Sequence, residues 1–464
     1  MTSRANPRHI AVIDVGKTNA KLALVDTKTF TEIAVVSRPN VVIDSAPYPH
    51  FDLEGHWAFF LENLKQFQKQ HGVEAISVTT HGAAVVLLDE VGNLATPMLD
   101  YEHDGPDKLA AEYDAIRPPF NQTGSPRLPM GLNAGAQLHW LFHHDPTLRE
   151  RTAHIVTYPQ YWGFRLTGVR ATDVTSLGCH TDLWLPQKER FSNLVDKLGI
   201  AAKLAPAQNS DYLLGTLKPE IAEATGLSTE TPVACGIHDS NASLLPHLVK
   251  REGAFSVIST GTWVISMAIG AETPTLDPAR DTLVNVSAFG APIPSARFMG
   301  GREFEIIRDG SNATPTEADR KAVLEREVML YPSVITESGP FAGCSHYWST
   351  EPTTAGERIY ALSLYLALMT QCCLDLIGGR GPTVVEGPFA QNADFLEMLA
   401  ALRRDGVQIE SSSTGTSIGA ALLMCEPPKN KKPKQIKAAP SADMQAYAKS
   451  WFLTVKDRIT DGSG

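Results

Sequence analysis

The fold of this chain is decided by its first aliphatic stretch, which reads Ile10-Ala11-Val12-Ile13-Asp14-Val15-Gly16-Lys17-Thr18-Asn19-Ala20-Lys21-Leu22-Ala23-Leu24-Val25-Asp26. Two aliphatic runs joined by a glycine turn predict a β-hairpin. Its tip offers Gly16 for close backbone approach, polar side chains at Thr18 and Asn19, and a cation at Lys21. Successive backbone N–H groups in such a turn form a concavity that binds anions.

A carboxylate, Asp14, lies beside this anion-binding turn. A carboxylate and a phosphate are both negative, so they would lie close together only with a divalent cation between them. Mg²⁺ is typically held in this way, by one or two carboxylates plus substrate oxygens. The tip therefore predicts a site for Mg²⁺ and a polyphosphate. Gly16-Lys17-Thr18 is not a Walker A loop, because Ala11 stands where that motif needs glycine and the turn opens a strand rather than a helix.

The same pattern recurs at Ala254-Phe255-Ser256-Val257-Ile258-Ser259-Thr260-Gly261-Thr262-Trp263-Val264-Ile265-Ser266-Met267. Gly261 follows Gly16 by about one and a half typical domain lengths. Two matching hairpins predict two similar domains that face each other across a cleft, each providing one phosphate-binding tip. Either hairpin alone is compatible with an ordinary edge hairpin.

The composition of the 464-residue chain is that of a soluble globular protein, long enough for two domains. A net charge of −10 argues against nucleic acid and anionic membranes as partners, because these need a basic surface. The six cysteines have no C-x-x-C spacing and indicate reduced thiols. No apolar signal core or long uncharged apolar segment is evident, so we expect a cytoplasmic protein.

The first domain alternates strands and helices, which is typical of an α/β fold with a mixed sheet. Apolar residues from Trp57 to Phe67 recur at helical spacing, and strands are expected over 75–79 and 85–89. His81 and Gly82 follow the first of these strands as sugar-contacting candidates, although a buried structural histidine is the commoner case. The polar loop 100–105, with Asp100, is either a sugar pocket or a solvated acidic loop.

An aromatic segment over 158–168 surrounds one amide, Gln160, with Tyr161 beside it. Aromatic faces with an embedded amide suit the binding of a carbohydrate, but an aromatic cluster in the hydrophobic core has the same sequence pattern. We expect the second domain to begin near Thr231, with a strand over 232–237 followed by Asp239 at its carboxyl end. Ligands of α/β sheets gather at such ends.

Asp239 is our candidate for the base that takes the proton from an attacking hydroxyl and orients it towards the γ-phosphoryl group of ATP. The alternative is a helix N-cap. Further on, we expect a long apolar helix over 358–377, a strand over 383–386 that leads into Gly387, and a helix over 417–423. A lysine-rich linker (Lys429, Lys431, Lys432, Lys434, Lys437) precedes a tail helix whose apolar face (Met444, Tyr447, Ala448, Trp451, Val455) is expected to dock onto the body.

The ordered motifs of the chain resemble those of the FGGY family of carbohydrate kinases, over about residues 8 to 425. They are 14–21, Thr167-Gly168 with Thr172-Asp173, Gly236-Ile237-His238-Asp239, Ser259-Thr260-Gly261-Thr262, and Gly387 with Gly419-Ala420-Ala421. The resemblance implies two ribonuclease H-like domains of the actin and hexokinase type. We therefore expect an N-terminal domain at 8–230, a C-terminal nucleotide-binding domain at 231–425, and a linker with a tail helix at 426–464.

The resemblance also implies roles for individual residues, with ATP and Mg²⁺ as cofactors. Asp14 would help hold Mg²⁺, and Asp239 would be the catalytic base. The residues expected to contact the nucleotide are Gly16, Thr18, Asn19, Lys21, Thr260, Gly261, Thr262, Gly387, Phe389 and Asn392. Those expected to contact the sugar are His81, Gly82, Asp100, Gln160, Tyr161, His238 and Asp239.

His238-Asp239-Ser240 is similar to the His-Asp-Thr of the rhamnulokinase and fuculokinase branches. It favours phosphorylation of the primary hydroxyl of a 6-deoxy-ketohexose such as L-rhamnulose or L-fuculose. Departures elsewhere, such as Gln137 where the family has lysine and Gln160 where many members have aspartate, leave other ketoses or polyols open. An actin-like ATPase and a non-catalytic sugar sensor are further alternatives, and a homodimer is one assembly that the sequence allows.

Overall fold

The computed structural model describes residues 6–409, 415–426, 434–436 and 442–461. These residues form two compact units. The first comprises residues up to 251 together with 284–292 and 415–426, and the second comprises 252–283, 293–409, 434–436 and 442–461.

The first unit is a mixed α/β structure. Its strands are β1 (His9–Val15), β2 (Asn19–Asp26), β3 (Thr31–Pro39), β4 (Val42–Ile43), β5 (His50–Phe51), β6 (Ala75–Thr80), β7 (Val85–Leu88), β8 (His154–Thr157), β9 (Thr172–Asp173), β10 (Trp184–Leu185), β11 (Arg190–Phe191), β12 (Ala207–Gln208), β13 (Leu213–Thr216), β14 (Pro232–Ala234) and β15 (Ile237–His238). Its α-helices are α1 (Leu53–His71), α2 (Ala110–Ile116), α3 (Phe120–Thr123), α4 (Ala134–His144), α5 (Leu148–Arg151), α6 (Tyr158–Thr167), α7 (Val174–Leu177), α8 (Leu194–Lys197), α9 (Pro219–Thr225), α10 (Asp239–Lys250) and α15 (Thr416–Ala421).

The main sheet of this unit has the order β13-β14-β6-β1-β2-β3, and β15 also pairs with β6. The predicted hairpin is confirmed: β1 and β2 pair antiparallel with Asp14 opposite Lys21, and β1 runs parallel to β6. The predicted helix is α1, which Asp52 caps by accepting from Gly55 N at 2.8 Å and which ends at Gly72.

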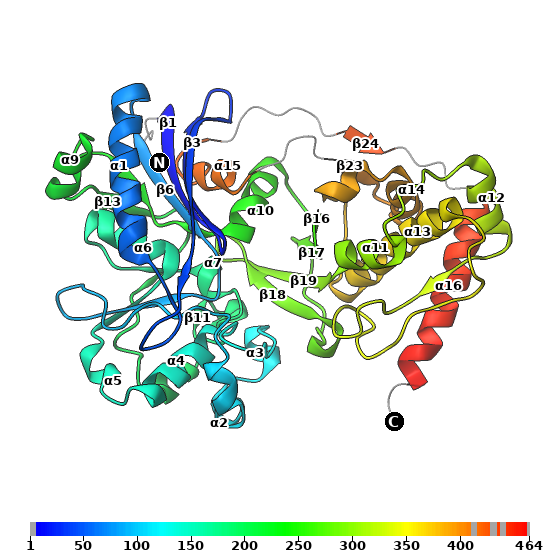
Figure 1. Cartoon of the computed structure of the whole chain (residues 1–464), viewed down its shortest axis with the longest axis horizontal. Coiled ribbons are helices and arrows are strands. Elements are labelled where there is room, and N and C mark those ends of the chain that lie inside the picture. The colour runs from blue at the N-terminus through cyan, green and yellow to red at the C-terminus, as the bar shows by residue number, and fades with distance from the viewer. Residues whose placement is uncertain (1–5, 410–414, 427–433, 437–441, 462–464) are drawn as a thin grey trace. The chain divides into compact units, whose positions relative to one another are not determined.

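Helices cover both faces of the first sheet, which is why residues 10–13 of β1 are all aliphatic. Ala11 and Ile13 pack with apolar residues of α1 and α6, whereas Ile10 and Val12 pack with those of α10 and α15. Figure 1 shows α15, drawn in orange, beside β1 and α10 although it comes some 400 residues after β1 in the chain.

The second unit repeats the central arrangement of the first. Its strands are β16 (Phe255–Thr260), β17 (Val264–Ile269), β20 (Leu330–Tyr331), β21 (Tyr347–Trp348), β22 (Thr383–Glu386), β23 (Val407–Ile409) and β24 (Lys434–Ile436), while β18 (Thr282–Val286) and β19 (Pro292–Phe298) include residues on both sides of the division. Its α-helices are α11 (Gly300–Arg308), α12 (Glu317–Glu325), α13 (Ala355–Leu376), α14 (Ala393–Leu402) and α16 (Ala442–Asp461). β16 pairs antiparallel with β17 and parallel with β22, as β1 does with β2 and β6.

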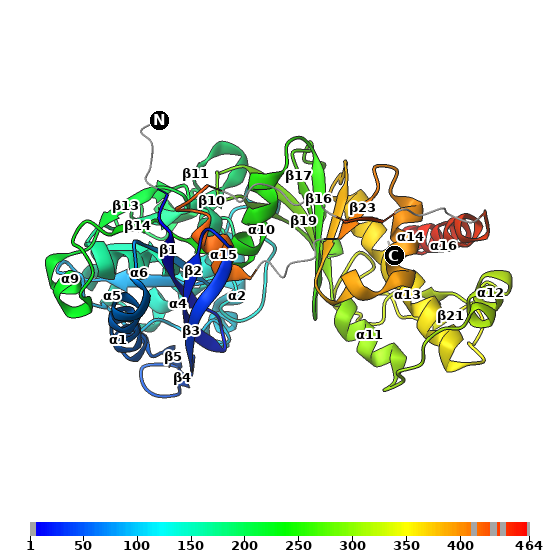
Figure 2. The same ribbon diagram turned by 90° about the horizontal axis from the view of Figure 1, so that it is seen from above.

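The tail helix docks onto the second unit as predicted. Trp451 is fully buried and donates from Nε1 to the carbonyl of Leu330 at 2.8 Å, and Tyr447 donates from its hydroxyl to the carbonyl of Val328 at 2.8 Å. Figure 2 shows α16, drawn in red, beside α14. The apolar face of α16 therefore belongs to the core of this unit.

Two features differ from the sequence prediction. The first unit continues to Arg251 rather than ending at 230, because β14 and β15 both pair with β6. Asp239 thus belongs to the first unit. The predicted linker also contributes a strand, since Lys434 lies in β24, which pairs with β23. Lys429, Lys431, Lys432 and Lys437 lie outside the described residues.

Helix α13 is the one helix, within the described residues, that is long and apolar enough to cross a membrane. However, 89% of its apolar window is buried inside the structure. Its residues pack with α14 and the strands of the second sheet. It is the core helix of the second unit.

Candidate active site

The tip of the first hairpin is held by hydrogen bonds from Asn40 and presents polar side chains to the surface. Asn40 donates from Nδ2 to the carbonyl of Gly16 at 2.8 Å, and its backbone N–H donates to the carbonyl of Thr18 at 2.9 Å. Thr18 and Asn19 are exposed. A Cβ on Gly16 would find its nearest neighbour at 3.6 Å, so the fold itself does not require glycine there. The turn therefore leaves room for a ligand to approach the backbone at Gly16.

Asp14 is anchored at the end of β1. Its Oδ2 accepts from the hydroxyls of Thr416 at 2.5 Å and Ser417 at 3.3 Å, and it lies 3.1 Å from Lys21 Nζ. Its Oδ1 makes no hydrogen bond to any described residue. One free carboxylate oxygen beside an exposed polar turn fits Mg²⁺, which usually keeps several waters and takes few protein ligands.

Lys21, the lysine predicted to contact the nucleotide, forms ion pairs within the first unit, and Lys17, to which the sequence analysis gives no role, reaches the predicted sugar loop. Lys21 is paired with Asp14 and with Glu32, and these carboxylates raise its pKa although burial opposes the shift. Lys17 instead reaches the predicted sugar loop: it forms a short ion pair with Asp100 and lies 3.1 Å from Glu102. The sequence analysis missed Lys17 as a site residue, because its partners are more than 80 residues away in the chain.

His81 follows β6 and is buried among aromatic rings, with Tyr101, Phe51 and Tyr158 at centroid distances of 5.1 to 5.3 Å. Burial lowers its pKa, so the ring is neutral. Its Nδ1 lies 2.9 Å from the carbonyl of Gly82 and must donate to it. Nε2 is then a buried acceptor, and it has no partner among the described residues. A ligand hydroxyl is the natural donor to it.

Asp239 begins α10, directly after β15, as the sequence predicts. Its Oδ1 accepts from Ser240 N at 2.6 Å and lies 3.1 Å from His238 Nε2. Its side chain is 29% exposed, and Oδ2 makes no hydrogen bond within the described part of the chain. Oδ2 is therefore an acceptor that is open to a hydrogen bond from a ligand hydroxyl.

Gln160 and Tyr161 lie in α6 and serve the fold. Gln160 is fully buried, donates from Nε2 to the carbonyls of Cys235 at 2.9 Å and Gly236 at 3.3 Å, and accepts from the hydroxyl of Thr157. The hydroxyl of Tyr161 accepts from Arg165 at 2.8 Å. The contacts of Gln160 attach α6 to the turn that follows β14, whereas the contact of Tyr161 lies within α6. Our proposal for the sugar leaves both residues out.

The second unit contains a cavity of about 600 Å³ beside its glycine tip. Its lining includes Gly261, Thr262, Phe304, Pro388, Phe389 and Asn392. This volume lies within the range of small-molecule and cofactor sites. The cavity therefore brings together the second tip and the junction after β22 that the sequence analysis links to adenosine.

Some residues around this cavity are held in contacts within the protein, and others are exposed at its surface. Thr260 is buried: its hydroxyl donates to the carbonyl of Glu386 at 2.6 Å and accepts from Phe389 N at 3.1 Å. Gly387 has φ +82°, and a Cβ there would lie 2.0 Å from the carbonyl oxygen of Thr260. Asn392 caps α14 by accepting from Phe395 N at 3.0 Å. Gly261 and Thr262 are exposed, and the hydroxyl of Thr262 makes no hydrogen bond to the described residues.

Two mixed sheets with the same hairpin and parallel strand at their centre, each with a glycine tip, define a protein of the actin and hexokinase fold. Comparison with family models agrees: residues 9–246 match the N-terminal domain of the FGGY family of carbohydrate kinases, and residues 252–434 match the carbohydrate kinase FGGY C-terminal domain. The chain belongs to the FGGY family of carbohydrate kinases.

The proteins similar to this chain include several kinases of carbohydrates. The crystal structure of a carbohydrate kinase from Novosphingobium aromaticivorans is 37% identical, with a TM-score of 0.89, and the match covers 96% of this chain and 100% of that one. L-fuculokinase of Escherichia coli (strain K12) is 27% identical over 281 residues, 57% of each chain. Autoinducer-2 kinase of Escherichia coli O9:H4 (strain HS) is 24% identical over 335 residues, 68% of this chain and 61% of that protein. The chain thus spans a little over half the length of the curated relatives that it matches.

Proposed function

We propose that the protein transfers the γ-phosphoryl group of ATP to the primary hydroxyl of a ketose, most specifically a 6-deoxy-ketohexose such as L-rhamnulose or L-fuculose. The observation that carries this proposal is Asp239: a carboxylate at a helix N-terminus with one oxygen fixed by the protein and the other unengaged. Phosphoryl transfer to an alcohol needs such a base to orient the hydroxyl and accept its proton.

Oδ2 of Asp239 would accept the proton of the attacking hydroxyl, while Oδ1 stays bound to Ser240 and His238. Neutral His81 would accept a hydrogen bond from another sugar hydroxyl at Nε2, and Asp100, fixed by Lys17, would accept from a further one. These are the acceptors that a polyol requires, since each buried hydroxyl needs a partner.

The nucleotide would bind the cavity of the second unit, and Gly16 and Gly261 are the glycines that we propose for contacts with its phosphates. Asp14, through Oδ1, would hold Mg²⁺, which supplies positive charge to the β- and γ-phosphate oxygens when bound. Thr18, Asn19 and Thr262 would add donors to the phosphates. The proposal places the reaction in the cytoplasm, where ATP is available.

The substrate class rests on His238-Asp239-Ser240, and the similarity to L-fuculokinase supports it. The test is a coupled ADP-release assay with Mg-ATP over L-rhamnulose, L-fuculose, D-xylulose, D-ribulose, gluconate and erythritol, with sugar-free and EDTA-treated controls. We expect the highest kcat/KM for a 6-deoxy-ketohexose, since discrimination is measured by that ratio. Preference for another substrate would refute the substrate class, and no sugar-dependent turnover with any of them would refute the kinase.

A further inference from the structure

A cysteine and a histidine that no motif connects lie side by side next to Asp239. Cys179 Sγ is 3.6 Å from His238 Nε2, and the two residues are only 5% and 6% exposed. They also explain Gly82: a Cβ on that residue would lie 2.6 Å from His238 Nε2 and 3.0 Å from Cys179 Sγ. The pair therefore fills the space directly behind the His81-Gly82 turn.

The hydrogen bonds of His238 fix the protons on its ring. Asn241 donates from Nδ2 to the carbonyl of Val286 at 2.6 Å, so its Oδ1 is the atom that lies 2.9 Å from His238 Nδ1. An amide oxygen only accepts, hence Nδ1 carries a proton. Nε2 lies 3.1 Å from Asp239 Oδ1, which already accepts from Ser240 N. Two acceptors would repel at this distance, hence Nε2 carries a proton too and the ring is an imidazolium.

A buried imidazolium needs counter-charge, and Cys179 is placed to supply it. Burial alone would raise the pKa of the Cys179 thiol, but the charges of His238 and His180 lower it to about 5. Burial alone would lower the pKa of His238, but Cys179 and Asp239 raise it to about 10. A thiolate is favoured beside such a cation.

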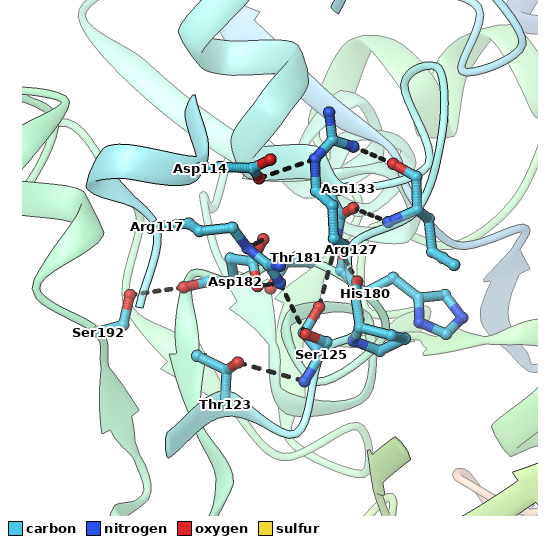
Figure 3. Close-up of polar contacts among 12 residues, drawn as sticks. Asp114, Arg117, Thr123, Ser125, Arg127, Asn133, His180, Thr181, Asp182 and Ser192 are labelled. Atoms are coloured by element: carbon cyan, nitrogen blue, oxygen red, sulfur yellow. Dashed lines mark hydrogen bonds and ion pairs between the residues drawn. The ribbon is translucent and has the colours of Figure 1, made fainter. Parts of the chain in front are cut away.

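The turn that carries Cys179 is held from outside by the polar network of Figure 3. His180 and Asp182 have φ of +55° and +61°, a conformation that costs energy for side chains other than glycine. Arg117 binds Asp182 at 2.8 Å, and Asn133 donates from Nδ2 to the carbonyl of His180 at 3.3 Å. The surrounding structure therefore imposes the turn that brings Sγ against His238.

We propose that Cys179 is a positioning residue, whose thiolate keeps His238 an imidazolium so that His238 holds Oδ1 of Asp239 and leaves Oδ2 directed at the acceptor hydroxyl. The catalytic part of this inference rests on the proposed function. The charged or titratable groups that face the pair are Asp239 on α10, His180 on the turn of Cys179, and His81 behind β6. Asp239 also brings a negative charge to His238 Nε2, at 3.1 Å, and Cys179 adds a second one on the same edge of the ring, opposite Asn241.

The ion pair is tested in the wild-type chain without any assay of turnover. Iodoacetamide is added between pH 6.5 and 8.5, and mass spectrometry follows the alkylation of the Cys179 peptide over hours, with N-acetylcysteine in the same tube. The rate for an ordinary thiol rises roughly fiftyfold over this range, because its pKa is about 8.5. We expect the rate at Cys179 to change by less than threefold. A rate that rises in step with N-acetylcysteine would overturn the ion pair.

The positioning role is tested with Cys179→Ser, which removes the charge and keeps a similar volume. We expect kcat to fall about tenfold with KM for ATP unchanged, and the alkaline limb of the kcat profile to move to lower pH by at least one unit, because His238 then loses its proton more easily. Cys425→Ser is the matched control, since among the described residues that thiol hydrogen-bonds only to the carbonyl of Ala421 and is far from His238 in the sequence. It should leave both quantities unchanged.

An unmoved alkaline limb in Cys179→Ser would overturn the positioning role, even if kcat falls through a loss of packing. Wild-type protein without sugar-dependent turnover would refute the proposed function instead. In that case the alkylation profile still decides whether Cys179 and His238 form an ion pair, so the two failures are distinguishable.

Discussion

The second glycine tip gives a sharp test of where the nucleotide binds. In Gly261→Ala the new Cβ would have its nearest neighbour, the carbonyl oxygen of Trp263, 4.0 Å away. The fold thus has room for the methyl group, and the stability of the unit should stay the same or rise by up to about 1 kcal/mol, because alanine reduces the entropy of the unfolded chain. Any loss of function must then come from the ligand side.

The expected loss can be worked out from the chemistry of the tip. A methyl group on this exposed turn holds a phosphate away from the backbone and removes about one charge-assisted hydrogen bond, worth about 1.5 to 3 kcal/mol. This corresponds to a rise of about tenfold to a hundredfold in KM for ATP, with KM for the sugar unchanged. Melting curves and initial-rate kinetics with varied ATP measure the two effects separately.

Gly301→Ala is the matched contrast, because Gly301 lines the same cavity. Its Cβ would lie 2.0 Å from the carbonyl oxygen of Gly261, so the backbone must move. We expect this variant to lose about 1 to 3 kcal/mol of stability as well as ATP affinity. The reasoning is refuted if Gly261→Ala keeps the wild-type KM for ATP, or if it melts like Gly301→Ala.

Three further predictions concern single side chains. Lys17→Met should raise KM for the sugar about tenfold and leave KM for ATP unchanged, since Lys17 binds Asp100 and Glu102. The control is Lys28→Met, because Lys28 is exposed, and equal kinetics in the two variants would contradict the role of Lys17. Trp451→Ala should cost about 3 to 5 kcal/mol in urea unfolding, and a loss below 1 kcal/mol would show that the tail helix is not part of the core. Burial raises the pKa of Glu303 to about 7, so the folded protein binds its proton more tightly than the unfolded chain. Stability should therefore fall by about 3 kcal/mol as pH rises from about 4.5 to about 7, and an equal slope in Glu303→Gln would contradict this.

The sequence predicts the local elements of the fold well, because their signals are local. The hairpin around Gly16 and that around Gly261 are visible as aliphatic runs with a glycine between them, and both are present. The sequence predicts a division between the units about 20 residues before the one in the structure, since the pairing of β14 and β15 with β6 joins segments more than 150 residues apart. Nothing local in 232–238 distinguishes a last strand of one sheet from a first strand of the next.

The candidate site shows the same limit. Asp239 was found because a strand end followed by a helix places it, and the structure has this arrangement. Lys17 and Cys179 were missed because each acts through a contact to a distant segment, with Asp100 and His238 respectively. Conversely, the amide of Gln160, set among aromatic residues, has the chemistry of a sugar-binding side chain. In the structure its Nε2 donates to two backbone carbonyls, and only the three-dimensional fold reveals these partners.

The most direct test of the central claim is kcat in Asp239→Asn, with Ser240→Ala as the neighbouring control. Asparagine keeps the size of the side chain but cannot accept a proton at neutral pH. We predict that kcat with the preferred sugar falls by about 10² to 10⁴, the usual contribution of a general base, while the dissociation constants for ATP and sugar change by less than about threefold. An Asp239→Asn variant that keeps kcat within about threefold of the wild type would contradict the account.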